Sequence, residues 1–185
     1  MTQYQVGDIL FIAIDNPLYR RVAAVSGSWT SHVGLIFDAT PGNEIVAESS
    51  FPLSKKSSLE SFKARSLGGQ YAAKRLQRGL SEQEKAGIRE AAEKRMGILY
   101  HTGFKLDSKR QFCSKFVYEI YREAVGLEVG SIETFHQLLR KQEKTPLWFW
   151  HLWYFGFVPW ERRTVTPASL HESPLLVTIE ECHRR

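Results

Sequence analysis

Residues 31–35 have the sequence SHVGL, which places His32 at the start of an apolar, β-branched run. Later in the chain, residues 112–114 have the sequence FCS, which places Cys113 at the start of a pattern typical of an amphipathic helix. A thiol that is activated by an imidazole is the nucleophile of a cysteine hydrolase. The first hypothesis is therefore a fold that brings this strand end and this helix start together.

Apolar runs around His32 predict the strands of a sheet. Residues 8–14 and 33–37 have the composition of buried strands, and residues 45–50 predict a third strand. Pro41-Gly42 is a turn dipeptide, so the second and third strands are expected to form a hairpin. With the turn centred on Thr40, His32 lies directly opposite Glu48, and facing Cβ atoms are about 4.5–5.5 Å apart.

A carboxylate at that distance could hold one imidazole nitrogen and leave the other free to act as a base. A register one residue away would instead send the two side chains to opposite faces of the sheet. The alternative is that His32 has a structural role, since a lone histidine at a strand end more often contributes to structure than to catalysis.

Capping signals and helical spacing predict four helices between and after these strands. Residues 52–69 are expected to form a loop with a short helix, and residues 71–77 a further strand. These strands and helices predict an α+β domain, in which an antiparallel sheet packs against helices. The expected helices begin at Pro17, run from Ser81 to Gly97 with a Ser81–Glu84 capping box, run from Cys113 to Val125, and follow a cap at Ser131 with Phe135, Leu138 and Leu139 on one face.

Cys113 has two interpretations. The first turn of a helix offers unpaired N–H groups and the positive end of the helix dipole, which both stabilise a thiolate, and the N–H of Cys113 could donate to an oxyanion. Alternatively, Cys113 is a small apolar residue that packs into the core, which is a common role of a free cysteine. Ser114 is the weaker nucleophile candidate, since the next residue should point elsewhere.

The composition narrows the class of protein. The chain has 185 residues with 43% apolar content, which is enough for the core of one domain. Its net charge of +5 is spread over basic residues interleaved with acidic ones, so no nucleic-acid partner is expected. No pair of Cys or His has metal-ligand spacing, so we expect neither a metal nor another cofactor. Only two cysteines and a start without a signal-peptide pattern favour a cytoplasmic location.

Three segments, GDILF at residues 7–11, SHVGL at 31–35 and IVAES at 45–49, together resemble the strand block of NlpC-type cysteine peptidases, which have a papain-like fold. In the common members the cysteine precedes this block, whereas Cys113 follows it, as in the YiiX/YebB-like branch of bacterial permuted hydrolases. The resemblance covers roughly residues 5–125 and implies a circularly permuted papain-like (NlpC-type) domain. It implies Cys113 as the nucleophile, His32 as the base and Glu48 as the residue that orients His32.

The same resemblance implies a substrate-binding role for Tyr100 and Phe104, the aromatic residues that precede the cysteine. The chain departs from the branch at three positions. Lys115 and Phe116 stand where Glu and Leu are usual, and His101 stands where an acid is frequent. None of these departures falls on the three catalytic candidates, but they could alter substrate preference.

An aromatic-rich segment, residues 146–160, holds four of the five tryptophans. We expect a single domain over residues 1–185 with this segment at the start of a C-terminal extension, from about residue 146. The segment is too short for a membrane span, which needs about 20 apolar residues. Because aromatic side chains occupy nearly every position, we expect it to be buried as core and pocket wall. An acyl-chain pocket or an interfacial membrane contact is the alternative, and membrane contact is not favoured.

The leading functional hypothesis is a cysteine amidase or peptidase. It would cleave an amide bond in a small peptide or an N-acyl amino acid through a Cys-His-Glu triad and an acyl-enzyme. One alternative is a lipid-directed acyltransferase or lipase, similar to the lecithin:retinol acyltransferase group. A catalytically silent binding module is the other, and selective labelling of Cys113 by a thiol-reactive probe would distinguish an enzyme from such a module.

Overall fold

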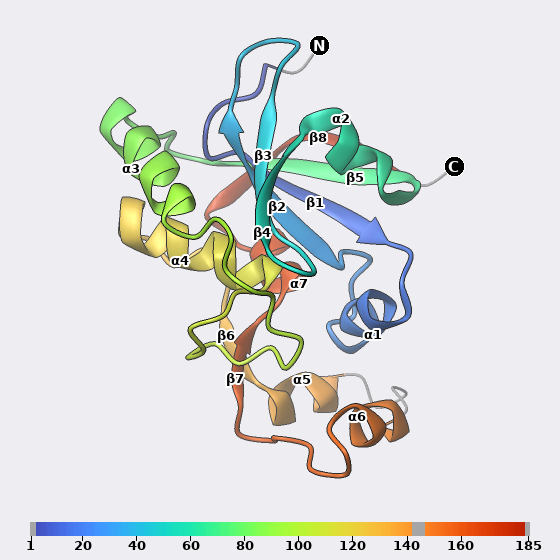
Figure 1. The fold of residues 1–185 in the computed structure, drawn as a ribbon. Coiled ribbons are helices and arrows are strands. Elements are labelled where there is room, and N and C mark those ends of the chain that lie inside the picture. The colour runs from blue at the N-terminus through green and yellow to red at the C-terminus, as the bar shows by residue number, and fades with distance from the viewer. Residues whose placement is uncertain (1–2, 142–146, 184–185) are drawn as a thin grey trace.

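A computed structural model describes residues 3–141 and 147–183 of the chain (Figure 1). Its centre is a six-stranded antiparallel sheet in the order β4-β3-β2-β1-β5-β8. The last strand of the chain therefore pairs with a strand from its first half. The strands are β1 (Ile9–Ile14), β2 (His32–Asp38), β3 (Ile45–Ser49), β4 (Ser54–Ser58), β5 (Ser66–Leu76) and β8 (Leu176–Cys182).

Helices cover both faces of this sheet. On one face α3 (Glu82–Glu93) and α4 (Cys113–Val125) pack together, and both contact β2 (Figure 1). On the other face lies the short helix α2 (Leu59–Ala64), whose fully buried Phe62 joins Leu10, Ile12 and Val46 in a second apolar cluster. Alternate residues of β1 and β2 therefore enter two different apolar layers, as the period of a strand requires.

Local sequence signals account for three of the helices. Helix α1 (Pro17–Val25) begins after Asn16, whose side chain accepts a hydrogen bond from the N–H of Leu18. The expected capping box is present at α3, with Ser81 and Glu84 each bonded to the other's backbone N–H. Helix α4 has the predicted bounds, because its apolar positions recur at helical spacing and Gly126 ends it with a φ of 72°.

Three expectations about secondary structure are wrong. Residues 54–58, expected in a loop, form the edge strand β4, which has the sequence SKKSS and no apolar alternation to indicate it. Helix α3 ends at Glu93, before Gly97. Ser131 caps no helix: residues 132–134 form β6 (Ile132–Thr134), and α5 (Phe135–Lys141) begins after Thr134, whose hydroxyl accepts a hydrogen bond from the N–H of Gln137.

The remaining elements extend away from the sheet. Strand β6 pairs with β7 (Arg163–Val165), and α5 and α6 (Trp148–Trp153) lie beyond them, at the end of the molecule far from the β2–β3 turn (Figure 1). Helix α7 (Pro167–His171) then leads into β8. The expected boundary near residue 146 lies outside the described residues, so the division into a domain and an extension stays a prediction.

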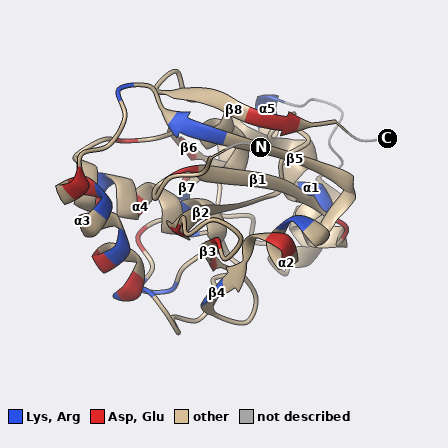
Figure 2. Cartoon of the chain, turned by 90° about the horizontal axis from the view of Figure 1, so that it is seen from above, with Lys and Arg blue, Asp and Glu red and all other residues tan. Residues whose placement is uncertain are grey.

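Charged positions are interspersed on this fold. Figure 2 shows acidic and basic residues interspersed along α3. Arg78 and Lys94, which lie just before and just after this helix, pair with its Glu84 and Glu90.

Among the described residues, no helix is long and apolar enough to cross a membrane.

Candidate active site

The β2–β3 hairpin brings His32 and Glu48 together with a register different from the predicted one. Glu48 lies opposite Gly34, so the pairing is shifted by two residues from the expected one. The turn is centred later than Thr40, and a bulge between Ile36 and Asp38 shifts the pairing again near the turn. A shift of two residues keeps side chains on the same face, so His32 and Glu48 become diagonal neighbours, which long side chains can bridge.

Their side chains form a buried polar pair. The Nε2 of His32 lies 2.6 Å from Oε2 of Glu48, and both side chains are completely buried. Glu48 accepts further hydrogen bonds from Arg65, whose Nη2 is 2.7 and 2.8 Å from the two carboxylate oxygens, and from the hydroxyl of Ser57 at 2.8 Å. A buried carboxylate needs partners of this kind to remain charged.

Cys113 is the first residue of α4 and is only 3% exposed. Phe112 precedes the helix with an extended backbone and provides no side-chain cap. The N–H groups of the first turn therefore have no capping side chain, and the positive end of the helix dipole lies at the sulfur. Ser114 points away to donate a hydrogen bond to the carbonyl of Val165 at 2.7 Å, which fastens α4 to β7.

Cys113 lies close enough to His32 to influence its charge. Burial alone would lower the pKa of His32, but interactions with Cys113 and with Glu48 outweigh it and raise the pKa to about 9. The His32 Nδ1 atom, which Glu48 leaves free, makes no well-aligned hydrogen bond in this structure. Hydrogen bonds between a catalytic base and its nucleophile often form only when a substrate is bound.

Glu48 responds in the opposite direction. Its burial would raise the pKa of the carboxyl, but His32 and then Arg65 outweigh burial and lower the pKa to about 2. At neutral pH these directions favour a charged Glu48 beside a protonated His32. An imidazolium is the counter-ion that a thiolate at Cys113 requires.

An apolar pocket opens beside the cysteine. It is narrow, with a cavity volume of about 30 Å³, and Cys113 forms part of its wall. Tyr100 and Phe104, the expected substrate-binding residues, line the same pocket, so three of the five candidate residues lie in its wall. His32, the fourth, lies beside Cys113. The rest of the wall is mainly apolar and includes Val22, Val25, Phe135, Leu138, Leu139 and Trp150. Glu48, the fifth, lies behind His32.

Sequence reasoning missed three residues of this site. Arg65 and Ser57 donate hydrogen bonds to Glu48. Tyr19 lines the pocket and packs edge-on against His32, with 5.7 Å between the two ring centroids. Burial raises the pKa of Tyr19 and of Tyr100, and negative charge at Cys113 raises both further. Their hydroxyl groups therefore stay protonated and can donate. Of the three, only Tyr19 could have been found from the sequence, because it lies on the helix that directly precedes the His32 strand.

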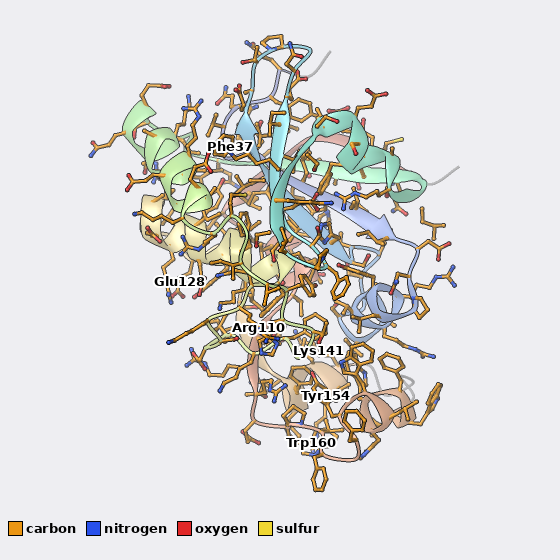
Figure 3. The ribbon with its side chains drawn as sticks, in the orientation of Figure 1. Phe37, Arg110, Glu128, Lys141, Tyr154 and Trp160 are labelled. Atoms are coloured by element: carbon orange, nitrogen blue, oxygen red, sulfur yellow. The ribbon has the colours of Figure 1, made fainter. Side chains whose placement is uncertain are left out.

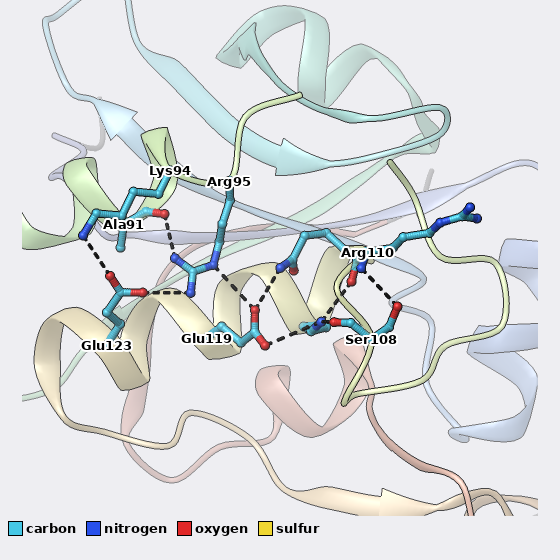
Figure 4. Close-up of polar contacts among 9 residues, drawn as sticks. Ala91, Lys94, Arg95, Ser108, Arg110, Glu119 and Glu123 are labelled. Atoms are coloured by element: carbon cyan, nitrogen blue, oxygen red, sulfur yellow. Dashed lines mark hydrogen bonds and ion pairs between the residues drawn. The ribbon is translucent and has the colours of Figure 1, made fainter. Parts of the chain in front are cut away.

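Lys115, one of the three residues that depart from the pattern, takes part in a polar network along α4 (Figure 4). The ammonium group of Lys115 is buried and donates to the carbonyls of Ser108 and Arg110, and Glu119 lies 3.6 Å from it. Glu119 also contacts Arg95, which in turn pairs with Glu123. Lys115 thus fixes the loop that precedes Cys113, whereas Phe116 is buried in the main core.

A metal site requires several side chains close together that can act as ligands. No group of three or more His, Cys, Asp or Glu within residues 3–141 and 147–183 is arranged to hold a metal ion. Cys113 and Cys182 are both free thiols.

Comparisons with known proteins agree with the fold. Residues 3–180 match the family described as "Permuted papain-like amidase enzyme, YaeF/YiiX, C92 family". The chain is 26% identical to the uncharacterized protein YiiX of Escherichia coli over 179 residues, which cover 96% of this chain and 86% of that protein.

A solved structure is similar as well. The crystal structure of YiiX from Escherichia coli, named there as a metalloprotein, superposes with a TM-score of 0.86 at 24% identity and covers 97% of this chain and 98% of that one. At this level of identity the likeness shows the fold, which is the permuted papain-like fold that the sequence predicts.

Proposed function

Because the chain belongs to the family of permuted papain-like amidases that includes YaeF and YiiX, we propose that it is a cysteine amidase. Its substrate is a small peptide or an N-acyl amino acid, and Cys113, His32 and Glu48 form its catalytic triad. The observation that carries the proposal is the buried His32–Glu48 pair at 2.6 Å next to a cysteine in the wall of a pocket.

The first half of the reaction is acyl transfer to sulfur. The Cys113 thiolate attacks the carbonyl carbon of the amide, and protonated His32 gives its proton to the leaving nitrogen as the C–N bond breaks. The products of this half are a free amine and a thioester on Cys113. Glu48 holds the ring through Nε2 so that Nδ1 faces the sulfur, and it stabilises the imidazolium.

Hydrolysis of the thioester completes the cycle. Neutral His32 takes a proton from a water molecule, the hydroxide attacks the acyl carbon, and the C–S bond breaks to release a carboxylic acid. The negative charge returns to Cys113 and the proton remains on His32, so the resting ion pair is restored. No other reactant is required.

Three groups near the sulfur could stabilise the oxyanion of each tetrahedral intermediate. The backbone N–H of Cys113 begins α4 without a capping side chain, and Tyr19 and Tyr100, which carry hydroxyl groups, line the same pocket as Cys113. Loss of one such donor in other acyl-transfer enzymes costs about 10²–10³ in kcat.

The apolar wall of the pocket favours the N-acyl amino acid over a polar peptide as substrate. Phe104, Phe135, Leu138 and Trp150 offer little to pair with polar side chains but suit an acyl chain. The same observation supports a second candidate, a lipid-directed acyltransferase or lipase. The two differ in the acceptor, which is water for the amidase and an alcohol or amine for the transferase.

The test is release of amine from N-acyl amino acids of increasing chain length. Wild-type protein should release amine and free acid in equal amounts, Cys113→Ala should release neither, and Cys182→Ala, the matched control, should retain full activity. Turnover that survives Cys113→Ala contradicts the proposal. Acyl transfer to an added alcohol in place of acid release would favour the second candidate, and a folded wild type that is inert to substrate and to iodoacetamide would favour a silent binding module.

A further inference from the structure

The segment from Leu147 to Trp160 presents apolar side chains to solvent, contrary to the expectation that it is buried. Trp150 and Val158 are buried, but Phe155 is 89% exposed, Phe157 86% and Leu152 70%. The expectation fails because α6 packs with only one side against α5 and the pocket, and no strand among residues 3–141 and 147–183 covers the other side (Figure 1). We call the exposed set the apex: Leu147, Trp148, Leu152, Phe155, Phe157 and Trp160.

The apex stands on a fixed base. Trp150 and Tyr154 pack edge-on against Phe135 of α5. The Trp153 indole donates to the carbonyl of Thr102, and the Tyr154 hydroxyl donates to the carbonyl of Gly103. Figure 3 shows Tyr154 and Trp160 at this far end of the molecule. Leu152, Phe155 and Phe157 beside them have no polar end to bond and remain mostly in solvent.

Exposure of this kind is unusual for a protein surface that faces only water. Apolar side chains are common singly on surfaces, but contiguous patches mark a binding site. Leu152 and Phe155 line one shallow hollow together with Phe149 and Trp153, so they form a continuous surface. This surface needs an occupant.

Charge indicates which occupant fits. Residues 147–160 contain no Asp, Glu, Lys or Arg. Basic side chains border the segment: Arg21 lies over the rings of Trp148 and Phe149, and Lys105, Arg162 and Arg163 surround Trp160. Acidic residues there are fewer, namely Asp107 and Glu161. Tryptophan and phenylalanine flanked by cations suit the boundary between anionic lipid headgroups and acyl chains.

We propose that the apex docks on the surface of an anionic lipid bilayer. Leu152, Phe155 and Phe157 enter the headgroup region, and the bordering basic residues contact lipid phosphates. Helix α6 also forms part of the pocket wall through Trp150, so the docked surface adjoins the site of Cys113. Where the proposed function also holds, the acyl group that enters the pocket comes from a molecule held in that bilayer.

The test is co-sedimentation of the whole protein with vesicles. Mixed phosphatidylcholine–phosphatidylglycerol vesicles should bind it, pure phosphatidylcholine vesicles should bind it less, and added salt should weaken binding. The double variant Phe155→Asn/Phe157→Ser should bind the mixed vesicles on the order of tenfold more weakly than the wild type does. Asparagine suits position 155 because Phe155 has a positive φ of 51°, so this variant should fold. Val177→Ser, at an exposed apolar residue of β8, is the matched control and should bind as the wild type does.

Three results would overturn the proposal. One is a wild type that binds neither type of vesicle, and another is binding that the double variant retains in full. The third is a wild-type dimer that the double variant converts to a monomer without vesicle binding, which would assign the apex to a second copy of the chain. None of these outcomes depends on amidase activity, so failure of docking and failure of the proposed function are distinguishable.

Discussion

The candidate active site and the apex are built in opposite ways. At the site, charged groups are buried and paired: Glu48 is fully buried, yet it has partners in His32, Arg65 and Ser57. At the apex, apolar groups are exposed to solvent, and Leu152, Phe155 and Phe157 are 70%, 89% and 86% exposed. Buried charges and exposed apolar side chains both reduce the free energy of unfolding, and proteins are only marginally stable. We therefore expect each region to have a function, which is chemistry at the site and binding at the apex.

The comparison predicts its largest effect at His32. His32→Ala removes both the proton donor and the counter-ion of Cys113, so kcat/KM on an N-acyl amino acid should fall by about 10³-fold or more. Phe157→Ser at the apex, assayed with a soluble substrate, should leave kcat/KM within about twofold. An equal loss in both variants would show that the two regions are not functionally distinct.

A double-mutant cycle tests whether His32 and Glu48 act as one unit. Glu48→Gln should reduce the rate less than His32→Ala, because the amide can still accept a hydrogen bond from Nε2. The combined variant should lose little more than His32→Ala alone. Additive losses would show that Glu48 acts elsewhere than through His32.

Arg65 allows a test of the buried charge through stability. Arg65→Met removes a cation from Glu48 while it keeps much of the side-chain volume, so the free energy of unfolding should fall by about 1–3 kcal/mol. Leu152→Ser at the apex should change it by less than about 0.5 kcal/mol. Urea denaturation of both variants and the wild type gives the comparison, and an Arg65→Met protein as stable as the wild type would contradict the assigned role.

The pH dependence of stability follows from the two shifted groups. The pKa of His32 rises from 6.5 to about 9, so its contribution is complete below pH 6.5 and is lost as the pH rises through 9. The pKa of Glu48 falls from 4.5 to about 2, so its contribution is complete above pH 4.5 and is lost as the pH falls towards 2. The acid limb is the test, because above pH 6.5 a thiolate at Cys113 would take up on unfolding the proton that His32 loses. Between pH 4.5 and pH 2 the free energy of unfolding should fall by about 1–3 kcal/mol more in the wild type than in Glu48→Gln. Equal declines in the two proteins would remove the charged Glu48 from the account.

Sequence reasoning predicted that His32 and Glu48 lie close together for a specific physical reason. His32 and Glu48 were paired with the wrong register, but the error was two residues, and strand periodicity conserves the face under such a shift. Cys113 was found because the apolar spacing and the terminal Gly126 define α4 without tertiary information. Arg65 could not be found in this way, since its contact with Glu48 depends on how α2 crosses the sheet.

Two of the wrong expectations, about β4 and about the apex, have a related cause. Strand β4 is an exposed edge with a polar sequence, so its pairing with β3 leaves no hydrophobic pattern. The apex was expected to be buried because it is apolar on almost every position. Hydropathy records what a side chain prefers, whereas burial also depends on whether the rest of the chain supplies a surface to cover it.

The central claim is that Cys113 reacts as a thiolate paired with protonated His32. Its most direct test is the rate of iodoacetamide modification at each cysteine, followed by mass spectrometry between pH 6 and pH 8. Cys182, at the end of β8, is the internal reference for how the reagent itself responds to pH. The account predicts a nearly constant rate at Cys113 in wild type and a steep rise with pH in His32→Ala. A wild-type Cys113 whose rate rises as steeply as that of Cys182 would contradict it.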